Sequence, residues 1–194
     1  MEKRRFLALG AAGAGALVQA HAVPSNARKG TGLLTVSGAI TRSNRGALDP
    51  ALDQLLVKHK ASFDRAWEFD AAMLARLPAQ TIQPTLEYDA KVHKLAGPAL
   101  SAVVEAAGVS PGASVSLRLR AIDGYTLSIS LADARAFRMI VATTLDSVPM
   151  ALGGLGPLWA VYDADRLAAF KDKPLKERFG LCPWGLYAID VQPV

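Results

Sequence analysis

The sequence predicts an α+β fold, a single domain built on a mixed, mainly-β sheet with short peripheral helices. The strongest observation is a hairpin signature over residues 115–131, where two runs of alternating apolar and polar residues flank Asp123-Gly124. Strand-like and short helix-like segments also follow one another without the regular spacing of βαβ units. Removing the first 22 residues would leave 172 of 194, the size of one domain, and 51% of the residues are hydrophobic, enough for a core.

Residues 1–22 have the pattern of a cleavable signal peptide. The basic Lys3-Arg4-Arg5 precedes an uncharged apolar run over 6–18, and Ala20-His21-Ala22 supplies a small-x-small cleavage pattern. The run is shorter than the ~20 residues that span a bilayer. We therefore expect a periplasmic protein that keeps no stable membrane anchor after cleavage. Arg4-Arg5-Phe6-Leu7 resembles a twin-arginine signal without its usual spacer, so twin-arginine and general secretory export both stay open.

The first half of the remaining chain predicts a flexible tether followed by alternating strands and helices. Residues 23–32 are polar and rich in Gly, Pro and Ser, and the folded domain is expected over 33–194. Apolar spacing and β-branched runs then predict the following elements. They are a strand at 33–40, a helix at 49–60, a strand at 67–69, a helix capped by Asp70, an extended segment at 81–88 and a helix at 99–107.

The second half predicts mostly strands around the hairpin. One face of that hairpin, Val115 to Leu131, is expected to be buried and the other polar. The elements that follow are a helical turn at 133–137, a buried strand at 139–144, a Pro/Gly-rich loop at 146–156, a strand at 157–162, an amphipathic helix at 164–171, a charged surface loop at 171–179 and a last strand at 184–191.

Charge and cysteine content exclude several classes of function. The formal net charge is +5, but about +3 once the signal residues are removed, and the basic residues are scattered. This disfavours a nucleic-acid partner, which requires a concentrated basic face. The one cysteine, Cys182, excludes an internal disulfide framework and a cysteine-based metal knuckle. Because Leu181-Cys182-Pro183-Trp184 is apolar, we expect a buried, inert thiol.

Few residues remain as candidates for chemistry or binding. The sequence has no phosphate-binding loop, and Gly153-Gly154-Leu155-Gly156 leads into a strand. No serine lies in a nucleophile-elbow pattern. His59 and His93 lack neighbouring metal ligands, so no metal site is expected. Asp123 and Asp146 both lie in turns between strands, where backbone geometry alone favours Asp.

Several segments follow one another in a specific order and spacing. They are 34–40, Phe69-Asp70 with Leu74, Leu77 and Pro78, Gly97-Pro98 with 100–108, Ile122-Asp123-Gly124-Tyr125, Leu131-Ala132-Asp133-Ala134, Leu145-Asp146 with Pro149-Met150, 156–162 and 184–191. Taken together, these segments resemble small periplasmic proteins of the molybdopterin-dependent oxidoreductase-like family, which share the sulfite-oxidase fold. The resemblance spans residues 33–194 and implies a mixed sheet with a pterin-type pocket.

The catalytic residues of that family are not matched. The resemblance implies a molybdenum-ligating cysteine early in the domain, whereas Cys182 precedes the last strand, and no arginine/histidine cluster for a pterin pyrophosphate is in place. The first hypothesis is therefore a non-catalytic periplasmic module, without cofactor, that binds a small ligand or another periplasmic protein. Its binding candidates are Asp123, Tyr125, Asp146 and His93.

Two alternatives stay open. One is an active molybdopterin oxidoreductase with atypical or partner-supplied metal ligation. The other is a cofactor-free hydrolase that uses Asp123, Asp146 or His93.

Overall fold

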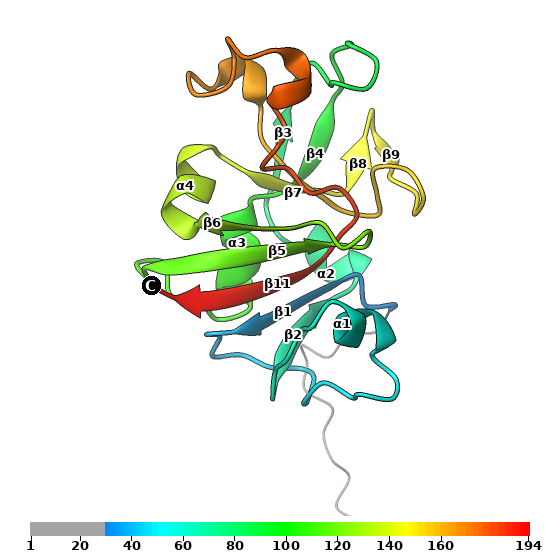
Figure 1. Ribbon diagram of the computed structural model, residues 1–194, viewed down its shortest axis with the longest axis vertical. Helices are drawn as coiled ribbons and strands as arrows, with labels where there is room; N and C mark the ends of the chain where they lie inside the picture. The colour runs from blue at the N-terminus through cyan, green and yellow to red at the C-terminus, as the bar shows by residue number, and fades with distance from the viewer. Residues whose placement is uncertain (1–29) are drawn as a thin grey trace, which may run out of the picture.

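The central sheet of the protein has five strands of mixed direction (Figure 1). The computed structural model describes residues 30–194, so the predicted signal peptide and residues 23–29 of the predicted tether lie outside the described residues. In spatial order the strands are β2 (Ala66–Phe69), β1 (Leu34–Gly38), β11 (Leu186–Pro193), β5 (Val115–Ala121) and β6 (Thr126–Ser130). β1 runs parallel to β11, and the other neighbouring pairs are antiparallel. The first and last described strands therefore lie side by side within the sheet.

A second group of strands lies above this sheet in the view of Figure 1. It consists of a four-stranded sheet and a two-stranded ribbon. The four-stranded sheet has the order β3 (Ala79–Ile82), β4 (Leu95–Pro98), β8 (Thr144–Leu145), β9 (Val148–Pro149), and the ribbon pairs β10 (Trp159–Val161) with β7 (Ile140–Ala142). The mixed, mainly-β α+β fold predicted from the sequence is confirmed.

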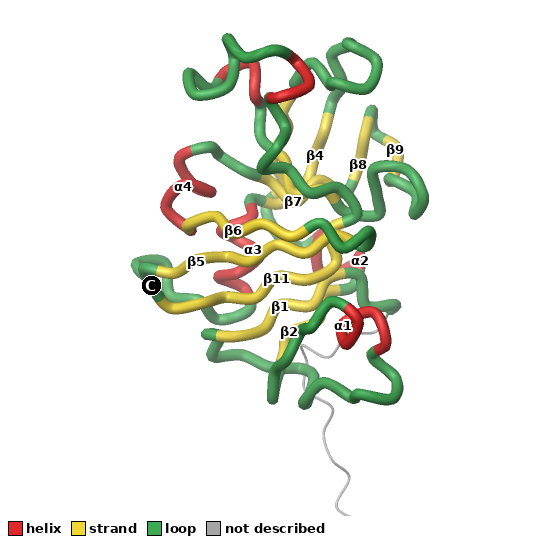
Figure 2. Tube along the Cα trace, in the orientation of Figure 1, coloured by secondary structure: helices red, strands yellow, loops and turns green. Residues whose placement is uncertain are grey.

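The helices are short, and they lie behind and around the central sheet in the view of Figure 2. They are α1 (Gln54–Lys58), α2 (Ala71–Ala75), α3 (Leu100–Ala106), α4 (Leu131–Ala136) and the 3₁₀ turns η1 (Ala164–Arg166) and η2 (Leu175–Glu177). Asp70 caps α2 as predicted, since its carboxylate accepts a hydrogen bond from the Met73 N–H at 2.8 Å. The same carboxylate accepts one from the Gly30 N–H, which fixes the end of the predicted tether. Within residues 30–194 no helix is long and apolar enough to cross a membrane.

One continuous core joins the two groups of strands. In its lower part the aliphatic residues Val36, Leu117 and Leu119 are fully buried in the central sheet, and Trp67 and Phe69 of β2 join them. Its upper part is aromatic, where the Tyr162 ring stacks on Phe170 with centroids 4.6 Å apart. The strands of both groups therefore contribute to a single cluster of buried residues.

The hairpin is confirmed, with one correction on its polar face. β5 and β6 pair as an antiparallel hairpin around Asp123-Gly124, as predicted, with Leu119 opposite Leu127. Arg120, predicted on the solvent face, is 8% exposed because α1 and the residues after it cover this end of the sheet. Its guanidinium donates to the His59 carbonyl at 2.8 Å, which satisfies the buried charge in part.

Three other predicted elements are shorter than expected. The helix predicted over 49–60 is reduced to α1, because the Asp49 carboxylate accepts from the backbone N–H groups of Ala51 and Leu52 and forms a turn. The extended segment at 81–88 pairs as a strand only to Ile82. The helix predicted at 164–171 is the single turn η1. The loop predicted at 171–179 contains η2 and ends in a buried residue, Phe179, which is 5% exposed and packs in the aromatic part of the core.

Candidate functional site

The candidate site is a two-lobed cleft beside the turn between β5 and β6. The two lobes share the lining residues Tyr88, Asp123 and Trp184. The larger, which we call the apolar lobe, has a volume of about 520 Å³, and the smaller, the acidic lobe, about 230 Å³. The apolar lobe is further lined by Ile122, residues 152–156 and Gly185. The acidic lobe is further lined by Glu87, Ala121, Tyr125, Phe179, Gly180, Cys182 and Pro183.

The β5–β6 turn holds Asp123 and Tyr125 in place through local hydrogen bonds. Gly124 has a φ of +93°, which an L-residue rarely adopts, and allows the tight turn. The Tyr125 N–H donates to the Asp123 carboxylate at 2.9 Å. The Tyr125 hydroxyl donates to the Gly180 carbonyl at 2.7 Å and so joins the hairpin to the segment before β11. The structure thus brings two of the four sequence-predicted candidates into the wall of one cleft.

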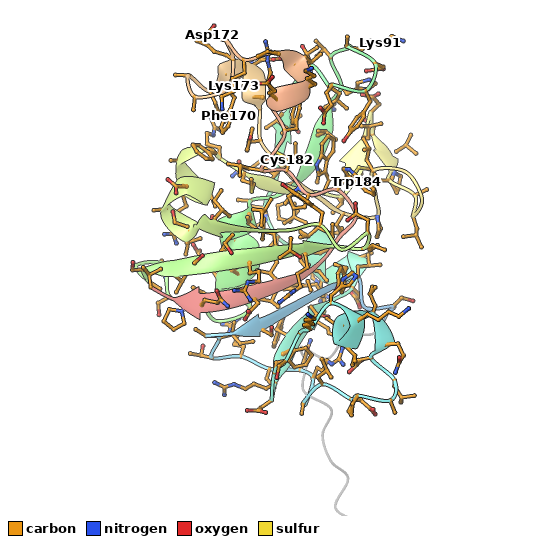
Figure 3. The ribbon with its side chains drawn as sticks, viewed as in Figure 1. Lys91, Phe170, Asp172, Lys173, Cys182 and Trp184 are labelled. Carbon is orange, nitrogen blue, oxygen red and sulfur yellow. The ribbon has the colours of Figure 1, made fainter. Side chains whose placement is uncertain are left out.

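The segment that carries Trp184 is tied to both neighbouring walls. The Ile122 N–H donates to the Gly185 carbonyl at 3.0 Å, and the Gly185 N–H donates to the Leu155 carbonyl at 3.1 Å. Cys182 accepts through its carbonyl from the Trp159 indole N–H at 2.9 Å. Figure 3 labels Cys182 and Trp184 along this segment, between the central sheet and the upper strands. These bonds connect three distant parts of the chain, so the cleft is preformed rather than assembled from loose loops.

The other two candidates, His93 and Asp146, meet in an ion cluster outside the cleft lining. The His93 ring bonds through Nδ1 to the Asp146 carboxylate at 2.7 Å and through Nε2 to the Asp89 carboxylate at 3.0 Å. The Lys94 N–H also donates to Asp146, at 2.9 Å. Asp89 follows the cleft residue Tyr88, so the cluster fixes the loop that carries Tyr88 against the β8–β9 hairpin. Asp89 was not among the sequence-predicted candidates, because its contact with His93 forms in a non-helical loop, where the sequence spacing gives no signal.

The cluster shifts the pKa of each of its members. Hydrogen bonds to Asp89 and then Asp146 raise the pKa of His93 above its usual 6.5. The bond from His93 lowers the pKa of Asp89, and the Lys94 N–H together with His93 lowers the pKa of Asp146. Both ring nitrogens of His93 are occupied, which leaves neither available to act as a base on a substrate.

In the acidic lobe, burial favours the protonated forms of Cys182 and Tyr88. It raises the pKa of the Cys182 thiol to about 12, since the side chain is 4% exposed and lies near the Glu87 carboxylate. Partial burial and the same carboxylate raise the pKa of Tyr88 to about 12. Cys182 is therefore the buried, inert thiol that the sequence predicted, and it is not a nucleophile at neutral pH.

The candidates for chemistry are divided between two places in the part of the chain that the structure describes. Asp123 lies in the cleft, whereas Asp146 and His93 lie in the ion cluster. Within the described residues no group of three His, Cys, Asp or Glu side chains is placed to hold a metal ion. The cleft itself provides shape, apolar surface and negative charge.

Comparisons with known proteins find similarity to solved structures and none in sequence. No family model and no curated protein matches the sequence. Among solved structures, the sulfane dehydrogenase SoxCD from Paracoccus pantotrophus matches with a TM-score of 0.51 and 11% identity over 83% of this chain. The chain has a distant molybdopterin-oxidoreductase-like fold. It spans 38% of the SoxCD chain, and the likeness concerns the fold alone.

The residues of this molybdopterin-oxidoreductase-like fold do not suit the cofactor of the family that the sequence resembles. The one thiol, Cys182, is held neutral, and the lobe that it lines contains the carboxylates of Glu87 and Asp123 but no Lys, Arg or His. An anionic pyrophosphate would be repelled there. Arginines do line three other cavities of the described chain, but none of the three contains a cysteine. They are Arg138 with Arg166 in one of about 410 Å³, Arg42 with Arg76 in one of about 160 Å³, and Arg120 in one of about 10 Å³.

Proposed function

We propose that the chain is an exported periplasmic binding module that works without a cofactor and holds a small, largely apolar molecule in the cleft. The observation that carries the proposal is the apolar lobe, whose volume of about 520 Å³ lies in the usual range of small-molecule sites. Large apolar side chains are exposed at its rim: Leu152 is 72%, Tyr88 55% and Trp184 37% exposed. Exposed apolar surface gathered around a concave site favours a ligand.

A small molecule is a better occupant than a partner protein. Its surface would be enclosed by walls that the hydrogen bonds of Gly185 already hold in position. The neutral thiol and the absence of cations in the lining of the cleft support a role without catalysis and without an anionic cofactor.

The test is binding of an uncharged apolar fluorophore, N-phenyl-1-naphthylamine, to the mature protein. We expect Leu152→Gln to weaken binding about fivefold, the factor that corresponds to ~1 kcal/mol of lost apolar contact. Leu52→Gln is the matched control, because Leu52 is 81% exposed and lies outside the cleft. Equal affinity of the two variants and the wild type would overturn the placement of the site. Binding of a protein partner through Leu152 without any small-molecule binding would overturn the small-molecule proposal.

A further inference from the structure

The acidic lobe combines aromatic rings with unneutralised negative charge. Four aromatic side chains line it, those of Tyr88, Tyr125, Phe179 and Trp184, which is an unusual share of its ten lining residues. Glu87 and Asp123 are the only charged residues among those ten. No cationic side chain opposes them in the lining, although the whole chain carries a net positive charge.

Neither carboxylate is neutralised elsewhere. Within the described residues Glu87 and Asp123 take part in none of the salt bridges. Asp123 uses its Oδ1 atom for the Tyr125 N–H, which leaves Oδ2 for a ligand. Glu87 is near enough to raise the pKa values of both Tyr88 and Cys182, so its carboxylate acts on groups inside the lobe.

This combination favours one class of ligand. The faces of aromatic rings carry partial negative charge and attract cations, and cages of such rings recognise quaternary ammonium groups. Carboxylates beside the rings add a net charge, and partial removal from water strengthens the attraction. A metal ion fits less well, because no group of three ligating side chains is assembled in the described chain.

We propose that the acidic lobe binds the ammonium head of an organic cation whose apolar remainder lies in the apolar lobe. The inference rests on the proposed function and adds the ligand class. The lobes meet at Tyr88, Asp123 and Trp184, so one molecule can occupy both. A head group in the acidic lobe would contact the rings of Tyr88 and Trp184 and the two carboxylates.

The experiment compares a cation with its uncharged analogue in ligand-observed NMR titrations of the mature protein. Choline and 3,3-dimethyl-1-butanol have the same shape and differ in charge. We expect choline to bind at least about tenfold more tightly. Hexyltrimethylammonium should bind more tightly than choline and should displace N-phenyl-1-naphthylamine, because its tail enters the apolar lobe.

Substitutions in the lining test whether the ammonium group binds in the acidic lobe. Glu87→Gln and Asp123→Asn should each reduce choline affinity about tenfold without changing the affinity for the alcohol, and the new Asn can still accept from the Tyr125 N–H. Trp184→Leu should weaken choline binding while it keeps an apolar side chain. Asp172→Asn is the control, since Figure 3 places Asp172 at the far upper end of the molecule, and its affinity should equal that of the wild type.

The outcomes separate this inference from the proposed function. Equal binding of choline and the alcohol, or no choline binding while the neutral fluorophore still binds, would overturn the ammonium site and leave the apolar site intact. Loss of fluorophore binding as well would overturn both. Binding of a lysine-rich peptide, with no binding of choline or hexyltrimethylammonium, would replace the small cation by a basic partner and would also overturn the inference.

Discussion

At the scale of single residues, His93 holds the ion cluster together, because its ring bonds to two carboxylates. It lies 2.7 Å from one carboxylate and 3.0 Å from another, which come from the loop of residues 83–94 and from the turn after β8. Asp146 and Ser147 both have positive φ angles, so that turn is tight, and its orientation depends on the contacts that Asp146 makes. The imidazole therefore links the loop that carries the cleft residue Tyr88 to the β8–β9 hairpin, which precedes residues 152–156 of the apolar lobe.

The first prediction concerns the pH dependence of this link. Since the folded pKa of His93 is raised, its contribution to stability is complete below its usual 6.5 and is lost as the pH rises through the folded value. Since the folded pKa values of Asp89 and Asp146 are lowered, their contribution is present above 3.8 and is lost as the pH falls through the folded values. The ion cluster is thus strongest between about pH 4 and pH 6.5.

Thermal unfolding of the wild type and of His93→Gln checks this. The difference in Tm should be largest near about pH 5 and should shrink toward about pH 8. A Tm difference that does not change over this range would show that His93 acts by packing and not by charge. Lys58→Gln serves as a control, because Lys58 lies in α1, outside the ion cluster.

At the scale of elements, the crossing of β4 over β7 determines how closely the upper strands approach the core. A Cβ atom on Gly97 would lie 2.0 Å from the Val141 carbonyl oxygen and 2.9 Å from the Ala142 Cα atom. The two backbones are therefore in direct contact, and only a residue without a side chain fits. β4 in turn pairs with β8, whose hairpin leads into the apolar lobe.

We predict that Gly97→Ala lowers the free energy of unfolding by about 2 kcal/mol or more, because backbone must move to accept the methyl group. Gly46→Ala is the matched control, since nothing lies within 4 Å of a Cβ atom there, and it should change stability by less than about 0.5 kcal/mol. Urea unfolding followed by tryptophan fluorescence measures both. Equal stabilities of the two variants would contradict the close approach.

At the scale of the whole molecule, a molybdopterin-oxidoreductase-like fold is combined with a cleft whose lining carries negative charge. Such a lining would repel the anionic pyrophosphate of a pterin cofactor. The neutral Cys182 and the carboxylates of Glu87 and Asp123 all lie in one lobe. Fold and function are separable, because function depends on the residues that a scaffold presents.

The corresponding prediction concerns protein exported by its own host. We expect mature protein from the periplasm to contain less than stoichiometric molybdenum and no extractable pterin, as measured by elemental analysis and by pterin fluorescence. N-terminal sequencing of the same sample should show Val23 as the first residue, if cleavage follows Ala22. Stoichiometric molybdenum with pterin would contradict the proposed function and favour an enzyme with atypical ligation.

The parts of this molecule that the sequence predicts are those determined by near neighbours. The β5–β6 hairpin and the cap at Asp70 depend on residues within a few positions, and both were predicted correctly. The apolar spacing predicts a helix over 49–60, yet Leu52 lies outside α1 and is 81% exposed, because the Asp49 turn replaces the first helical turn. Periodicity cannot show such competition between side chain and backbone.

The candidate site was predictable only in part for the same reason. Asp123 and Tyr125 belong to a local turn and were identified as candidates. Tyr88 and Trp184 are nearly a hundred residues apart, and their meeting depends on how the two sheets pack. Pairing of β1 with β11 is likewise a long-range contact that no local pattern specifies.

That pairing also has a consequence for the order of events during synthesis. β11 lies between β1 and β5, so the ribosome makes the middle of the sheet after the strands on both sides. Until residues 186–193 emerge, the nascent chain consists of two separate antiparallel pairs, β1 with β2 and β5 with β6, each with an open edge toward the missing strand. Such a chain cannot complete its central sheet until residues 186–193 have emerged from the ribosome, and its open strand edges stay available for pairing with other chains during that interval.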